Sequence, residues 1–79
     1  MVDTELFRSK VKEKGVKLCY LAKGIGISKY GLYLKIINEQ QFKADEITGL
    51  CDLLGIDDLT EKESIFFARD VAEKGTNNG

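Results

Sequence analysis

The sequence has no histidine, and its only cysteines are Cys19 and Cys51. A zinc site would have to combine two thiolates with carboxylates, a donor set that structural zinc sites rarely use. The chain also lacks a glycine-rich phosphate loop, and neither cysteine has an evident base partner for nucleophilic catalysis. We therefore expect a protein that is not an enzyme and that takes no metal, no cofactor and no small-molecule substrate.

Long apolar runs and an apolar leader are missing as well. No stretch approaches the roughly 20 apolar residues that cross a bilayer, and residues 1–10 lack the apolar core of a secretory signal. Both cysteines fall on apolar faces of predicted helices, which favours buried free thiols in a reducing compartment over a disulfide. These features predict a cytoplasmic protein with no membrane partner.

The composition is that of a small globular domain, with 43% hydrophobic and 32% charged residues in a chain of 79. A chain of this length can form one domain with a thin core. We expect that domain to span residues 1–74 and residues 75–79, GTNNG, to form a frayed tail.

The net charge of −1 conceals two halves of opposite sign. Residues 1–37 contain eight Lys or Arg against three Asp or Glu, whereas residues 38–79 contain four against ten. Because salt screens charges over about 8 Å, a basic face can attract DNA phosphates while an acidic face on the far side is repelled. The unevenness indicates a nucleic-acid partner, unless it is a chance feature of a solvated surface.

Apolar residues recur at helical spacing along the chain, which predicts an all-α protein with five helices. Asp3 or Thr4 can cap the first helix, and Gly15 and Gly55 are placed to end the first and the fourth. The predicted helices cover residues 4–14, 16–23, 29–37 and 44–54, and a fifth runs from the capping box Thr60–Glu63 to Glu73 or Lys74. In the first helix, Leu6, Phe7 and Val11 form the expected buried stripe, and Phe42 is expected to plug the core.

Residues 17–37 read as two short helices joined by a tight turn. Ala22 is small enough to let two helices cross closely, and Gly26 can adopt the positive φ with which the chain leaves the first helix. Leu32 fills the wedge between the helices, and Ser28 is placed to cap the second one. This arrangement is typical of a DNA-binding helix-turn-helix.

The second helix of this unit is the predicted recognition helix. If Leu32 and Ile36 face the core, the remaining faces carry Lys29, Tyr30, Tyr33, Leu34 and Ile37. The two tyrosines are three residues apart and can contact phosphates, base edges or a thymine methyl. The alternative is that one of them packs on a neighbouring helix.

The fifth predicted helix carries more apolar residues than a small core needs. Either both of its phenylalanines are internal, or one of them is left for a partner chain. We expect the latter, a homodimer formed through the C-terminal part. The apolar residues concerned are Ile65, Phe66, Phe67, Ala68, Val71 and Ala72.

Together these segments resemble a known family. LAKGIGISKYGLYLKII (residues 21–37) and NEQQFKADEITGLCDLLGIDDLTEKESIFFARDV (residues 38–71) are similar to the Cro/CI-type (XRE) helix-turn-helix family. The pattern is closest to small phage or prophage repressor-like proteins of Gram-positive bacteria. The residues that carry the resemblance are Ala22, Gly26, Leu32, Phe42, Asp45–Ile47 and Ile65–Ala68.

The resemblance implies a five-helix λ-repressor-like domain that binds an operator in double-stranded DNA as a dimer and controls transcription. It also implies that a set of residues faces the major groove. These are Ser28, Lys29, Tyr30, Tyr33 and Leu34.

Three positions depart from the family pattern. Leu18 stands where many members carry a phosphate-contacting glutamine, which makes Lys17 the nearest substitute. The loop after residue 37 lacks a basic pair and contains Glu39, and Lys43 stands where a hydroxyl cap is expected. We therefore expect DNA binding that is weaker than in a typical relative or at a different angle. The alternative function is a protein-interaction module, antirepressor- or antitoxin-like, on the same scaffold.

Overall fold

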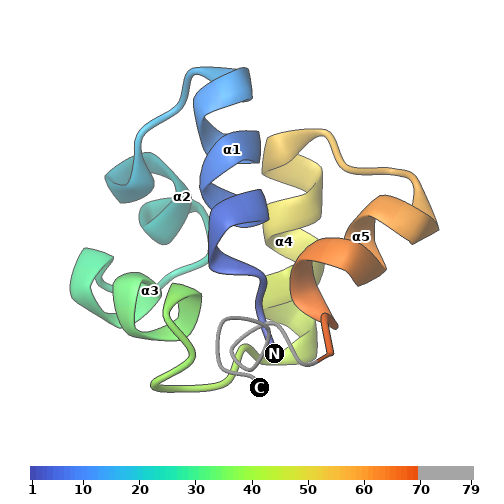
Figure 1. Cartoon of the computed structure of the whole chain (residues 1–79). Helices are drawn as coiled ribbons and strands as arrows, with labels where there is room; N and C mark the ends of the chain where they lie inside the picture. Colours follow the sequence, from blue (N-terminus) through green and yellow to red (C-terminus); the bar gives the residue numbers. More distant parts are fainter. Residues whose placement is uncertain (70–79) are drawn as a thin grey trace.

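The computed structural model describes residues 1–69, which form five α-helices and no strand (Figure 1). The predicted all-α class is confirmed. α1 and α4 lie at the centre, α2 and α3 lie on one side of them, and α5 lies on the other. The helices are α1 (Thr4–Lys14), α2 (Leu18–Gly24), α3 (Lys29–Ile36), α4 (Ala44–Leu54) and α5 (Leu59–Phe66).

Two predictions concern residues after residue 69. The predicted domain limit at residue 74 and the tail at residues 75–79 lie outside the described residues. Within residues 1–69, no helix has the length and apolar character needed to cross a membrane.

Local signals set the ends of α1 and α4, and the predicted bounds of both helices are confirmed. The Asp3 carboxylate caps α1 by accepting the N–H of Leu6 at 3.1 Å. Gly15 and Gly55 end α1 and α4 with φ of 72° and 70°, the left-handed region in which glycine has no steric penalty.

The observed bounds of α2 and α3 differ slightly from the predicted ones. α2 begins at Leu18, later than predicted, because Lys17 has extended backbone with φ −100° and ψ 151°. Val16 precedes it outside the helix and packs against the core. α3 ends at Ile36, one residue earlier than predicted.

α5 starts from a different cap than the sequence suggested. The Asp58 carboxylate accepts the N–H of Glu61 at 3.1 Å, so the helix begins at Leu59. The predicted capping box Thr60–Glu63 is therefore wrong. An equally good acceptor stands two residues earlier in the chain, and it is the one that the fold uses.

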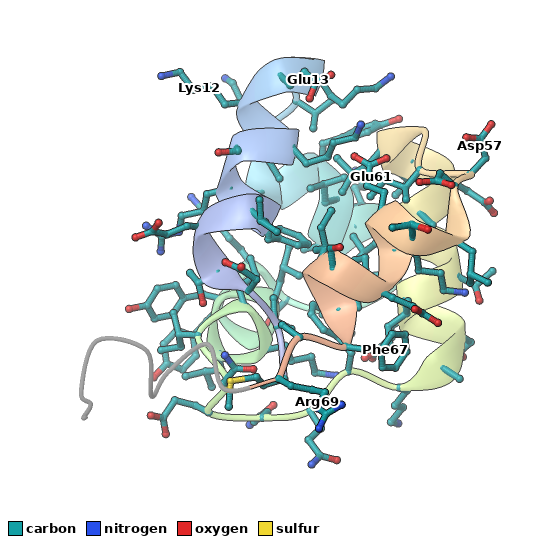
Figure 2. All side chains as sticks on the ribbon, turned by 45° about the vertical axis from the view of Figure 1, so that its right-hand side comes forward. Lys12, Glu13, Asp57, Glu61, Phe67 and Arg69 are labelled. Carbon is teal, nitrogen blue, oxygen red and sulfur yellow. The ribbon has the colours of Figure 1, made fainter. Side chains whose placement is uncertain are left out.

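α5 also ends early, at Phe66, whereas the sequence suggested an end at Glu73 or Lys74. The reason is a competing partner for the backbone. The N–H of Ala68 donates to the carbonyl of Met1 at 2.9 Å rather than continuing the helix. Figure 2 shows the chain leaving α5 at this point, beside the loop that precedes α4.

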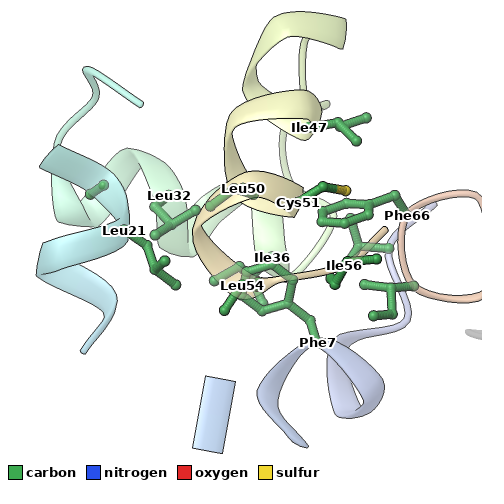
Figure 3. Close-up of a cluster of buried hydrophobic side chains, with 13 residues drawn as sticks. Phe7, Leu21, Leu32, Ile36, Ile47, Leu50, Cys51, Leu54, Ile56 and Phe66 are labelled. Atoms are coloured by element: carbon green, nitrogen blue, oxygen red, sulfur yellow. The ribbon is translucent and has the colours of Figure 1, made fainter. Parts of the chain in front are cut away.

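The core lies where the five helices converge (Figure 3). Phe66 meets Phe7 and Phe42 edge to face, with ring centroids 5.9 Å and 5.6 Å apart, an arrangement that aromatic rings favour. The predicted place of Phe42 against the core is confirmed. The buried apolar residues are Val2, Phe7, Leu21, Ala22, Leu32, Ile36, Ile47, Leu50, Cys51, Leu54, Ile56, Ile65 and Phe66.

Two burial predictions are wrong. Leu6 is exposed, because Phe7 and Val11 occupy the core-facing stripe of α1 and Leu6 lies about 100° away around the helix. Cys19 is exposed as well, on the outer side of α2. Cys51 is buried as predicted, and burial raises the pKa of its thiol.

Candidate nucleic-acid interface

The turn between α2 and α3 is built around Gly26. Its φ of 78° favours glycine, and nothing crowds the position of a Cβ, so conformation rather than space requires glycine there. Ala22 is buried, and its carbonyl accepts the N–H of Ile27 at 3.0 Å. Leu32 from α3 is fully buried beside it. The predicted conformation and burial at Ala22, Gly26 and Leu32 are confirmed.

Two other glycines let this unit pack closely on α4. A Cβ at Gly24 would come within 2.6 Å of Leu53 Cδ1, and a Cβ at Gly49 would come within 2.9 Å of Ile25 Cγ2. Both distances are too short for real carbon contacts. The low helix propensity of Gly24 is therefore offset by closer contact between α2 and α4.

Ser28 caps α3 as predicted, accepting the N–H of Gly31 at 2.9 Å. A Cβ at Gly31 would lie 3.1 Å from the Ser28 hydroxyl oxygen. That contact is tight, but the equivalent caps at Asp3 and Asp58 bond the N–H groups of Leu6 and Glu61, so the cap itself does not require glycine.

α3 presents two aromatic rings to solvent. Tyr30 is 68% exposed and Tyr33 is 40% exposed. Their rings stack with centroids 6.3 Å apart and planes inclined by 25°. Leu32 and Ile36 are buried on the inner side of the same helix. The result is a short helix with a packed inner face and an outer face that carries two adjacent phenol groups.

The remaining predicted site residues flank this pair. Ser28 and Lys29 are exposed at the start of α3, and Lys17 is exposed immediately before α2. Leu34 is half-buried, and its carbonyl accepts the N–H of Glu39 at 2.8 Å. The structure thus brings four of the six residues together at the exposed side of α3, with Leu34 partly covered and Lys17 apart from them, just before α2.

Two of the eight basic side chains in residues 1–37 form ion pairs with carboxylates of residues 38–79. Lys10 pairs with Glu61 at 2.9 Å, and Lys35 pairs with Glu46 at 2.6 Å. The other six basic residues of this half are exposed: Arg8, Lys12, Lys14, Lys17, Lys23 and Lys29.

The sequence argument overlooked Tyr20, which is exposed on α2. The sequence contains a clue to its role, because all three tyrosines of the chain fall between residues 18 and 36. All three are exposed in the structure. A tyrosine combines an apolar ring with a hydroxyl that donates and accepts, so this clustering is relevant to a polar partner.

The Lys35–Glu46 pair was also unforeseen, because Lys35 was counted as part of a basic surface. Both side chains are nearly enclosed, at 11% and 8% exposure. Burial by itself raises the pKa of Glu46. The hydrogen bonds from the Lys35 ammonium and from the Lys43 N–H, together with their charges, outweigh it and leave that pKa below its ordinary value.

A groove of about 390 Å³ lies at the end of α5, beside the loop that follows α3. Phe67 contributes to it and is 53% exposed (Figure 2). The lining residues are Met1, Val2, Asn38, Gln40, Gln41, Phe42, Ile47, Phe66 and Phe67. The groove therefore combines apolar side chains with three side-chain amides.

Within residues 1–69, no group of three or more His, Cys, Asp or Glu side chains is placed to hold a metal ion. No protein-family model, no curated protein and no solved structure matches the chain.

Proposed function

We propose that the protein is a transcriptional regulator that binds double-stranded DNA in a sequence-specific manner. On this proposal it is a λ-repressor-like domain of the Cro/CI-type (XRE) kind, and α2, the Gly26 turn and α3 form its helix-turn-helix. The observation that carries the proposal is the exposed Tyr30–Tyr33 stack beside Lys29, on a helix whose opposite face is packed into the core.

Each exposed residue has a role that suits its chemistry. Lys29 and Lys17 neutralise phosphates at the two helix starts, and the Ser28 hydroxyl adds a phosphate contact. Tyr30 and Tyr33 reach base edges in the major groove. Leu34, which is half-buried, offers a smaller apolar surface for a thymine methyl.

The test is the salt dependence of binding to duplex DNA. A dimer that neutralises roughly six to ten phosphates loses about 10³ to 10⁵ in affinity between 50 and 200 mM salt. A binding selection with the DNA that flanks the gene for this chain identifies the bound site. Titration of that site at several salt concentrations then gives the dependence of affinity on salt. Absence of binding to duplex DNA at every salt concentration contradicts the proposal.

We further propose a homodimer, formed through the groove at the end of α5. Phe67 and Met1 are apolar, exposed and adjacent to this groove, and a second copy would remove them from water. Two copies of α3 could then read two half-sites one helical turn apart, at about 34 Å.

Sedimentation at tens of micromolar tests the dimer. Phe67→Ser is expected to shift the protein towards monomer, whereas Leu59→Ser is not. Leu59 is the matched control because it is exposed at the opposite end of α5 from Phe67 and does not line the groove. A wild-type protein that sediments as a monomer at all concentrations contradicts this part of the proposal.

The same groove supports the second candidate function, a protein-interaction module on this scaffold. Its apolar lining and three amides suit a peptide segment of another regulator. Salt-independent failure to bind DNA, combined with a Phe67-dependent complex with such a partner, would favour this function over the first.

A further inference from the structure

α3 is anchored to the rest of the fold by few residues. Three of its side chains are buried, Leu32, Lys35 and Ile36, and one of these carries a charge. Its main packing partner is α2. A helix of eight residues held largely by two apolar side chains has little to fix its rotation about its own axis, because apolar contacts are not directional.

Lys35 supplies a directional contact to α4. Its Nζ lies 2.6 Å from Oε1 of Glu46, and the same oxygen accepts the N–H of Lys43 at 2.9 Å. One carboxylate oxygen therefore joins the last turn of α3 to the first turn of α4. Lys43 directly precedes α4, and its own side chain makes no cap hydrogen bond to the helix. The bond from its N–H to Glu46 therefore helps to fix the start of α4.

A second polar contact holds the same end of α3. The Thr4 hydroxyl donates to the carbonyl of Ile36 at 2.7 Å. The C-terminal end of α3 is thus joined to α1 by one hydrogen bond and to α4 by one buried ion pair. Tyr30 and Tyr33 project from the opposite, exposed side of the helix held in this way.

Stability alone does not account for a buried ion pair. Removing two charges from water costs about as much as their attraction returns, and well-packed apolar pairs are often equally stable. A buried pair does impose a defined geometry, because each partner needs the other at hydrogen-bond distance. The main effect of this pair is therefore to fix the position of α3 relative to α4.

We infer that Lys35 and Glu46 are positioning residues that set the orientation of the Tyr30–Tyr33 face for base recognition, without touching DNA themselves. This inference rests on the proposed function, since it concerns how selectively α3 reads a site. On this inference Lys35 does not bind phosphate. It fixes the orientation of α3 instead.

The test compares the double variant Lys35→Met/Glu46→Leu with wild type. Because an apolar pair replaces an ion pair, we expect a folded protein with an unfolding midpoint close to that of wild type. The ratio of affinities for selected and unrelated DNA should fall about tenfold or more. The slope of log affinity against log salt should stay unchanged, because Lys17 and Lys29 are retained.

A second interhelical ion pair among residues 1–69 provides a control. Lys10→Met/Glu61→Leu removes the pair between α1 and α5, and we expect it to leave the affinity ratio unchanged. Lys35→Arg keeps the charge beside Glu46 and should retain most of the ratio. If the first double variant does not fold, Glu46→Gln takes its place, because it keeps the shape and an acceptor for the Lys43 N–H.

The inference is overturned if the folded variant discriminates between sites as well as wild type does. Ring NMR shifts of Tyr30 and Tyr33, on the exposed face of α3, give a readout that does not need DNA. They should change in Lys35→Met/Glu46→Leu and not in the control pair. If wild type binds no DNA, the proposed function fails. The positioning of α3 is then judged by these shifts alone, and unchanged shifts overturn it.

Discussion

Asn38 and Val2 lie 36 residues apart and exchange two hydrogen bonds through the Asn38 side-chain amide. The N–H of Val2 donates to Oδ1 at 2.7 Å, and Nδ2 donates to the carbonyl of Val2 at 2.9 Å. Asn38 has a φ of 69°, a left-handed conformation that asparagine tolerates better than most residues. Because Asn38 follows α3 closely, the pair fastens the end of α3 to the N-terminal segment.

Asn38→Ala should lower the free energy of unfolding by about 2–3 kcal/mol. Two partly buried hydrogen bonds are lost at about 1 kcal/mol each, and alanine adds about 1 kcal/mol of strain at a positive φ. Asn38→Gly loses the same hydrogen bonds without that strain, so urea unfolding of both variants separates the two effects. A loss below about 1 kcal/mol in Asn38→Ala would contradict the importance of this contact.

Tyr33→Ala and Lys29→Ala should weaken DNA binding in different ways. The first should reduce discrimination at one base position by about 1–3 kcal/mol, because a base-edge contact is removed. The second should weaken binding to all sequences and flatten the salt dependence by about one unit of slope. Fluorescence titration against a panel of single-base operator variants distinguishes them. If Tyr33→Ala alters neither affinity nor preference, α3 is not the reading helix.

Ser28→Ala should cost about 1 kcal/mol of stability through loss of the α3 cap. Asp58→Ala removes the matching cap of α5 and should cost a similar amount, which makes it the control. Only the Ser28 variant should also lower DNA affinity, because only that cap lies at the proposed interface. Equal DNA affinity in the two variants, measured at a temperature where both are folded, would exclude a contact by Ser28.

Acid should destabilise wild type more steeply than Lys35→Met/Glu46→Leu. The pKa of Glu46 lies below its ordinary value of 4.5 in the folded protein. The stabilisation it provides is therefore complete above pH 4.5 and is lost as the pH falls through the lower, folded pKa. Urea unfolding from pH 7 to 3 measures the two slopes, and the other carboxylates act on both proteins alike. Parallel slopes would show that this pair does not contribute to the pH dependence of stability.

Much of the helical pattern could be predicted because its causes are local. The caps at Asp3 and Ser28 need only an oxygen close in sequence to free N–H groups, and the ends at Gly15 and Gly55 need only a residue that accepts positive φ. The conformation of Gly26 follows from the same rule. These features are confirmed at the predicted residues.

Predictions failed where several partners competed. Asp58 and Thr60 are both capable caps, and only the path of the chain into α5 selects Asp58. The helical pattern continues past Phe66, but the carbonyl of Met1 takes the N–H of Ala68. Within the candidate interface, the exposure of Tyr30 could be expected from helical geometry.

The sequence by itself determined the five helices, the glycine turn after α2 and the presence of a basic half, because these depend on residues close together in the chain. Only the tertiary structure decided that Lys35 lies inside and pairs with Glu46, that Leu6 lies outside, and that Phe67 borders a groove. Burial depends on which distant segments meet, and a one-residue difference in position around a helix rotates a side chain by about 100°. For that reason the orientation of α3 had to come from the fold.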